Sequence, residues 1–235
     1  AIVGTVHLIS TQRLKRRLRQ QQALERERSR IARDLHDQLG ANLTQVSLLG
    51  EMVEGDKDLR EEVEAHARQI TQTSRETTRA LDEIVWATNP ANDTLEGLVN
   101  YLCKYAQEYL ALASIRYRLE VPSQLPAMPL LPDVRHNVFL AAKEAVNNVV
   151  KHARASSTWI RLRLESTQFI LEIQDDGCGL PDAAKSSTRN GLKNMRKRLE
   201  DIGGSFDIAP APERGTVVRL TVPLQIPSFE FRVSP

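Results

Sequence analysis

Apolar residues recur at steps of three and four along the first third of the chain, which is the spacing of one helix face. From about Gln12 to Trp86 there is no proline, and glycine is sparse. One apolar stripe comprises Ile31, Leu35, Leu39, Leu43, Val46, Leu49 and Val53, and a second comprises Val63, Ala67, Ile70, Ser74, Thr77, Leu81 and Ile84. Gly55-Asp56-Lys57 lies between them. The pattern predicts two long helices joined by a short turn, an antiparallel hairpin over residues 12–89.

A single hairpin would leave one side of each stripe in contact with water. Two hairpins that pack as a symmetric four-helix bundle bury both sides. The stripes therefore predict a homodimer.

The pattern changes after WATNPANDT, residues 86–94, where Pro90 and polar turn residues end the helix. We expect helices over 95–112 and 133–153, and a third near 191–202 that ends at Gly203-Gly204. Strands are predicted around 115–121 and in the runs WIRLRLE, FILEIQD and TVVRLTVPL. Helices mixed with mostly antiparallel strands predict an α/β sandwich domain over residues 90–225. No role is predicted for the tail, residues 226–235.

Composition and charge change this picture only at the N-terminus. The chain has 235 residues, 41% hydrophobic and 26% charged, which is ordinary for a soluble protein. Its cysteines, Cys103 and Cys178, match no metal spacing and are interpreted as reduced, cytosolic thiols. The net charge of +2 conceals a strongly basic stretch, RLKRRLRQQQ, directly after the apolar AIVGTVHLIS.

This order of apolar and basic residues is typical of a transmembrane helix that ends on its cytoplasmic, positively charged side. Ten residues are too few to span a bilayer, which takes about 20. We therefore interpret residues 1–11 as a truncated transmembrane stump and expect the native protein at the cytoplasmic face of the inner membrane. The alternative is the frayed start of an apolar helix.

The first cluster with candidate chemistry is KEAVNNVVKHA, residues 143–153. On a helix, Glu144, Asn148 and either Lys151 or His152 lie one turn apart and share a face. Carboxylate and amide oxygens suit Mg²⁺, while lysine and histidine can bind phosphate oxygens. Taken alone, these residues are more typical of a solvated helix surface.

Two further clusters follow at intervals along the same domain. DDGCGL, residues 175–180, ends a predicted strand, and its glycines allow a tight turn and a close approach to a ligand. In RNGLKNMRKRL, residues 189–199, Gly191 opens a helix whose first amides could receive phosphate. RGTVVRL adds Thr216 at a strand start. Each cluster is common by itself, and only their order and spacing carry information.

Together the clusters resemble the N, G1 and G2 boxes of the GHKL (Bergerat) ATP-binding fold, which histidine kinases share with type II topoisomerases and heat-shock chaperones. The resemblance implies that Glu144 and Asn148 manage Mg²⁺ and its water, and that Asp175 reads the adenine amine. It also implies that the glycines bound a short nucleotide lid. The implied ATP site consists of Glu144, Asn148, Lys151, His152, Asp175, Gly177, Gly179, Gly191, Leu192 and Thr216.

The stretch ERERSRIARDLHDQLGANLTQVSLLGEM gains its meaning from this second domain. It resembles the phosphoacceptor helix of sensor histidine kinases that work with NarL-type response regulators. The resemblance implies that His36 takes the γ-phosphoryl group of ATP. Asp37 follows it and could hold one ring nitrogen while the other, unprotonated nitrogen reacts. In an isolated helix, a solvated surface histidine would be the better interpretation.

One position departs from the pattern of this subfamily. Its members often carry glutamine four residues after the acid, where it places water for dephosphorylation of the regulator. Here Asp37 is followed at that spacing by Ala41, which cannot orient water. We therefore predict that phosphatase activity is weak or depends on another residue, with Gln38 a poor substitute.

The sequence thus predicts the core of a two-component sensor kinase that uses ATP and Mg²⁺ to phosphorylate His36. An aspartate of a NarL-type response regulator would then receive the phosphoryl group. The main alternative is a dimeric scaffold whose GHKL domain binds nucleotide without catalysis. The histidine-bearing hairpin disfavours a protein-serine kinase of the anti-sigma type. Direct binding of nucleic acid is disfavoured because no helix that could read bases follows the basic stretch.

Overall fold

The computed structural model describes residues 2–55, 60–179 and 190–224. Within the first helix, the side chains of Leu35 and Gln38 are among those outside this description. The expected turn after Gly55, the nucleotide lid and the tail 226–235 lie outside the described residues as well. The chain divides into two compact units, residues 1–92 and 93–235. This division falls close to the boundary expected between residues 89 and 90.

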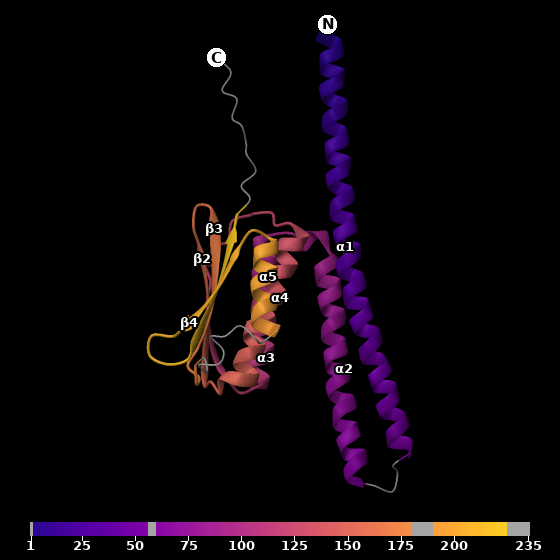
Figure 1. The fold of residues 1–235 in the computed structure, drawn as a ribbon, viewed down its shortest axis with the longest axis vertical. Helices are drawn as coiled ribbons and strands as arrows, with labels where there is room; N and C mark the ends of the chain where they lie inside the picture. Colours follow the sequence, from indigo (N-terminus) through magenta and orange to yellow (C-terminus); the bar gives the residue numbers. More distant parts are fainter. Residues whose placement is uncertain (1, 56–59, 180–189, 225–235) are drawn as a thin grey trace. The chain divides into compact units, whose positions relative to one another are not determined.

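The first unit is a helical hairpin. Helix α1 (Ile2–Gly55) and helix α2 (Arg60–Thr88) lie side by side, and a short 3₁₀ turn, η1 (Pro90–Asn92), follows them (Figure 1). Helix α1 runs without a break through residues 2–11, which we interpreted as the stump of a transmembrane helix. In the part of the chain that the structure describes, no helix combines the length and apolar character needed to cross a bilayer.

The apolar stripes of the hairpin are only partly buried. Ile31 and Leu49 are buried in α1, whereas Leu43 remains 50% exposed. In α2 the residues buried near the middle are Thr73, Thr77 and Ala80, while the expected Leu81 is 46% exposed. Apolar residues that repeat on average every three and a half positions form a seam along the helix, and such a seam can pack against more than one partner helix. One neighbouring helix covers one edge of that seam, and Ala67, Ser74 and Leu81 of the second stripe are exposed within a single hairpin. A lone hairpin was expected to leave one side of each stripe in contact with water.

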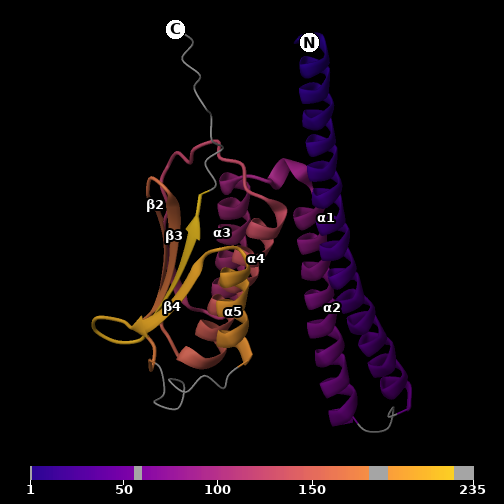
Figure 2. The ribbon, with the colours of Figure 1, turned by 45° about the horizontal axis from the view of Figure 1, so that its top comes forward.

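The second unit is a five-stranded sheet with helices on one face. In chain order its elements are α3 (Leu95–Leu112), β1 (Arg116–Glu120), α4 (Pro132–Asn148), a π-helical turn η2 (Val149–Ala153), β2 (Ser157–Leu164), β3 (Gln168–Asp175), α5 (Asn190–Asp201), β4 (Ser205–Pro210) and β5 (Thr216–Pro223). The strand order is β1-β2-β3-β5-β4, with β1 parallel to β2 and every other pair antiparallel. Helices α3, α4 and α5 cover the same face (Figure 2). The α/β sandwich expected from the sequence is confirmed.

Alternating side chains of the three central strands form the core under the helices. They are Ile160 and Leu162 of β2, Phe169, Leu171 and Ile173 of β3, and Val218, Leu220 and Val222 of β5. Small residues of α4, including Ala141, Ala142 and Ala145, are buried as well and allow this helix to approach the sheet closely. The strand β4 was not predicted, because it is a short edge strand in which Phe206 is the one buried side chain.

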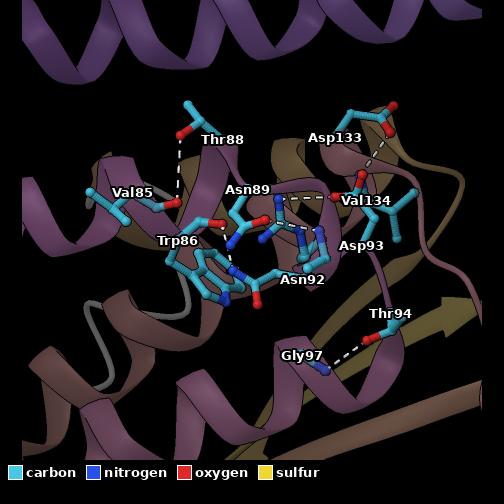
Figure 3. Close-up of polar contacts among 12 residues, drawn as sticks. Val85, Trp86, Thr88, Asn89, Asn92, Asp93, Thr94, Gly97, Asp133 and Val134 are labelled. Carbon is cyan, nitrogen blue, oxygen red and sulfur yellow. Dashed lines mark hydrogen bonds and ion pairs between the residues drawn. The ribbon is translucent and has the colours of Figure 1, made fainter.

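A buried ion pair fixes the first residues of this unit. The Arg135 side chain of α4 is fully buried, and its Nη2 lies 3.0 Å from Asp93 Oδ1. The Leu130 amide donates to the Asp93 carbonyl oxygen at 2.9 Å. Thr94 then caps α3 by accepting from the Gly97 amide at 3.0 Å (Figure 3). These contacts set the position at which the chain enters α3.

Replacing Asp93 with alanine should lower the free energy of unfolding of the second unit by about 3 kcal/mol, because a buried guanidinium would lose its carboxylate. Chemical denaturation of the full chain, followed by a signal from the sheet, measures this change. Glu108→Ala, at an exposed position of α3, serves as the control and should have little effect. A loss below 1 kcal/mol for Asp93→Ala would contradict the role assigned to the ion pair.

Candidate functional site

The end of α4 forms one wall of the site. Glu144 and Asn148 lie one turn apart on α4 and are half-buried, and Asn148 is the last residue of the helix. The π-helical turn that follows carries Lys151 and His152, both exposed. Arg154 ends the turn in a left-handed conformation with φ of 52°. The structure thus presents the polar residues of KEAVNNVVKHA on one continuous helical segment, as the sequence predicts.

The loop after β3 packs directly on this segment. The Cys178 amide donates to the Ala153 carbonyl oxygen at 2.8 Å. A Cβ atom on Gly177 would overlap that same carbonyl group, so the close approach itself requires glycine at this position. Gly179 adopts a φ of 75°, a conformation that glycine reaches without strain. The two glycines of DDGCGL are therefore required for different reasons. Gly177 leaves room for the Ala153 carbonyl group, and Gly179 allows a positive φ.

Asp175 is the buried carboxylate of the site, with 5% of its surface exposed. Burial raises the pKa of this carboxyl group, and hydrogen bonds from the backbone amides of Gly177 and Thr216 partly oppose the shift. The Gly177 amide lies 2.8 Å from Asp175 Oδ1. Gly215 packs so closely that a Cβ atom there would overlap the Asp175 carbonyl oxygen. The predicted residues Asp175, Gly177 and Thr216 therefore do meet.

Asp176 points to different partners. Its Oδ1 accepts from the amides of Ser156 and Ser157 at 2.8 and 2.9 Å, and its Oδ2 accepts from the Ser156 hydroxyl at 2.7 Å. Burial acts to raise the pKa of Asp176, but these hydrogen bonds outweigh it and hold the pKa below its usual range. Asp176 thus ties the loop to the start of β2. Sequence reasoning did not assign it a role, although two adjacent acids at a strand end were the visible signal.

The second group of predicted residues lies between α4 and α5. A Cβ atom on Gly191 would overlap Glu144 Oε1, so the start of α5 rests against this carboxylate. A pocket of about 290 Å³ opens beside them. It is lined by Leu140, Lys143, Glu144 and Asn147 of α4 and by Gly191, Asn194, Met195 and Arg198 of α5. Cationic and amide side chains here could bind phosphate oxygens. Leu192 is half-buried beside Gly191.

His36 and Asp37 lie together on α1 in the other unit, and both are exposed. The neighbouring Leu39 is half-buried, which places the histidine at the border of the apolar stripe. Ala41, the position of the departure from the subfamily pattern, is exposed on the same helix. A nucleophile must be reachable, and this placement meets that requirement.

Both units match known protein families. Residues 27–93 match the family described as "Histidine kinase". Residues 134–226 match the family described as "Histidine kinase-, DNA gyrase B-, and HSP90-like ATPase". The first match contains His36 and Asp37, and the second contains every residue of the implied ATP site.

Individual relatives agree with these matches. Sensor histidine kinase YvfT of Bacillus subtilis is 30% identical over 200 residues, covering 84% of this chain and 50% of that protein. Sensor histidine kinase LiaS of the same organism is 24% identical over 202 residues, covering 86% and 55% respectively. The chain therefore spans about half the length of these curated relatives.

A solved structure shares the fold. The histidine kinase domain from the Erythrobacter litoralis EL346 blue-light activated histidine kinase superposes with a TM-score of 0.53 at 18% identity. The superposition covers 82% of this chain and 94% of that one.

The two adjacent aspartates should affect stability in opposite directions. Because its folded pKa is lowered, Asp176 stabilises the fold above about pH 4, the usual carboxyl pKa, and this contribution disappears as pH falls through the folded pKa. Because its folded pKa is raised, Asp175 is least costly below about pH 4 and becomes destabilising as pH rises through its folded pKa. At pH 7, Asp176→Asn should lower the free energy of unfolding by about 1 kcal/mol, while Asp175→Asn should not lower it.

Urea denaturation of both variants at pH 7 and at pH 3.5 measures these effects. The deficit of Asp176→Asn should shrink at the lower pH, because the carboxyl group of the unfolded chain then takes up a proton more readily than the native carboxylate and the advantage of the native hydrogen bonds falls. Equal destabilisation by the two substitutions at pH 7 would contradict the assignment of separate roles.

Proposed function

Because the chain belongs to the histidine kinase family, we propose that it catalyses ATP-dependent phosphorylation of its own His36 and passes the phosphoryl group to an aspartate of a response regulator. One combination carries the proposal. An exposed histidine followed by an acid lies on the helical hairpin, and a buried carboxylate at a strand end lies in an ATPase-family domain of the same chain. A scaffold that only binds nucleotide would have no use for the first of these.

The cluster around Asp175 is the proposed site for the adenine base. A carboxylate held at a strand end by backbone amides can accept a hydrogen bond from an exocyclic amine. Thr216, buried beside it, adds a hydroxyl that can donate or accept. Glu144, Gly191 and Leu192 of the second group, with Lys151 and His152 on the π-helical turn, are proposed to face the phosphates. Gly177 and Gly179 are proposed to give the loop after β3 the backbone conformation it needs between the base site and the phosphate site.

Glu144 and Asn148 are the proposed protein side of the Mg²⁺ site. Their carboxylate and amide oxygens are hard ligands, they lie one turn apart on α4, and both are half-buried. Glu144 also lines the pocket beside α5, which can hold ligand phosphates. When bound to the triphosphate, Mg²⁺ supplies neutralisation of the charge that develops during phosphoryl transfer. The oxygen donors of Glu144 and Asn148 are of the type that this ion prefers.

His36 is the proposed nucleophile and Asp37 its partner. A neutral imidazole nitrogen attacks the γ-phosphorus, and the bond to the β,γ-bridging oxygen breaks, which leaves ADP. Asp37 holds the proton on the other ring nitrogen and stabilises the positive charge that the ring gains. The exposure of both side chains supports this assignment.

A homodimer is proposed for the hairpin. Leu43, Leu48, Met52, Leu81 and Val85 are large apolar side chains of the hairpin that are exposed in a single chain. Two hairpins packed as a four-helix bundle would cover such residues. We further propose a NarL-type receiver domain as the acceptor of the phosphoryl group, and we assign the basic stretch after residue 10 to the cytoplasmic face of a membrane. The relatives YvfT and LiaS are sensor histidine kinases, which supports a response regulator as the acceptor.

Replacement of His36 by glutamine should abolish labelling of the chain by γ-labelled ATP and Mg²⁺, because the attacking nitrogen is gone. His66→Gln in α2 of the same hairpin is the matched control and should leave labelling within about twofold. Nucleotide binding should be unchanged in both variants. Label that persists in His36→Gln would mean that another residue is the acceptor, and unlabelled native protein that binds ATP would favour the scaffold.

Introducing the subfamily's glutamine by Ala41→Gln should accelerate dephosphorylation of the cognate regulator, because the amide can orient an attacking water. An increase of about tenfold is expected, less than the roughly 10²–10⁴-fold of a positioned acid or base, because the amide orients the water without accepting its proton. Loss of label from the phosphorylated regulator, timed with and without the kinase, measures it. If Gln38→Ala instead slows dephosphorylation by the native sequence several-fold, Gln38 already performs this task and the prediction is wrong.

A further inference from the structure

Arg214 connects the turn between β4 and β5 to the loop after β3. Its Nε donates to the Gly177 carbonyl oxygen at 3.0 Å, a bond between residues 37 positions apart. The turn that carries it is itself closed, because the Ala211 amide donates to the Gly215 carbonyl oxygen at 3.0 Å. Gly215, the next residue, packs against the Asp175 backbone with a φ of 95°. The backbone that carries Arg214 is therefore held in place by the turn and by the contact of Gly215 with Asp175.

Two hydrogen bonds hold the peptide group between Gly177 and Cys178. Arg214 binds its carbonyl oxygen, and the Ala153 carbonyl oxygen accepts from its N–H at 2.8 Å. Glycine has broad backbone freedom, so these bonds decide the conformation that Gly177 adopts. The Gly177 amide in turn donates to Asp175 Oδ1 at 2.8 Å. Arg214 and the Asp175 carboxylate are thus both hydrogen-bonded to Gly177.

We propose that Arg214 is a positioning residue for base recognition: it orients the Gly177 backbone, which orients the Asp175 carboxylate toward the exocyclic amine of a bound adenine nucleotide. This inference rests on the proposed function insofar as Asp175 receives the adenine base. Arg214 does not itself contact the base in this account. The guanidinium group suits the task better than an ammonium, because Nε has a fixed direction within a rigid plane.

Two nucleotides that differ only in the exocyclic amine distinguish a positioning role of Arg214 from a purely structural or electrostatic one. Purine riboside triphosphate is adenosine triphosphate without the exocyclic amine, and it keeps the same ring, ribose and charge. Loss of positioning should weaken binding of ATP alone. Loss of positive charge or of folding should weaken binding of both ligands equally.

The test compares dissociation constants of the full chain for these two nucleotides by calorimetry. Arg214→Met should weaken ATP binding about fivefold, the effect of one charge-assisted hydrogen bond at a partly exposed site, and should weaken the analogue less than twofold. Arg214→Lys should lose most of the same preference, although it keeps the charge. Arg163→Met, which removes a positive charge from an exposed position of β2, should leave both constants unchanged.

Equal weakening of both nucleotides in Arg214→Met, full preference in Arg214→Lys, or no change in either variant would each overturn the positioning role. Equal affinity of the native chain for the two nucleotides would overturn it as well, together with the assignment of Asp175. Failure of the native chain to bind ATP at all would instead contradict the proposed function. Thermal melting of each variant shows whether it is folded at the temperature of the measurement.

Discussion

The site depends on the burial of one carboxylate, Asp175, among backbone groups. A buried charge needs hydrogen-bond donors, and the amides of Gly177 and Thr216 supply them from two different segments. Gly215 approaches the Asp175 backbone so closely that it cannot carry a Cβ atom, and Gly177 is constrained in the same way by the Ala153 carbonyl group at the end of the π-helical turn. The loop after β3, the end of α4 and the turn before β5 are therefore fixed together around a group that opposes the stability of the fold when ionised.

Helix α4 connects this cluster to the pocket beside α5. Its buried alanines lie against the sheet, while Glu144 and Asn147 on another face line the pocket. At its end the helix widens into the π-helical turn, and the Ala153 carbonyl oxygen accepts from the loop that carries Gly177. The same element thus sets the spacing between the proposed base site and the proposed phosphate site. Such spacing is what phosphoryl transfer requires, because positioning and charge neutralisation provide most of the catalysis.

The sequence predicted the elements and several site residues because their signals are local. The spacing of KEAVNNVVKHA, the glycines of DDGCGL and the helix end at Gly203-Gly204 each reflect a backbone requirement within a few residues. The contacts of Arg214 with Gly177 and of Asp176 with Ser156 join distant segments, so no local pattern indicates them. The burial of Thr73 and Ala80 in α2 was missed for a related reason, whereas Thr77 belonged to the predicted stripe and is buried. The spacing of apolar residues predicts the seam of a helix, but it does not predict which edge of that seam the neighbouring helix of the hairpin covers.

The central claim is that a nitrogen of this chain accepts the γ-phosphoryl group of ATP. Phosphorus NMR of the full chain after incubation with ATP and Mg²⁺ tests it most directly, because nitrogen-bound and oxygen-bound phosphoryl groups differ in chemical shift and in stability toward acid and alkali. The account predicts one phosphohistidine signal that acid removes and alkali preserves. A phosphoester signal that survives acid, as expected of a serine kinase, would contradict the claim.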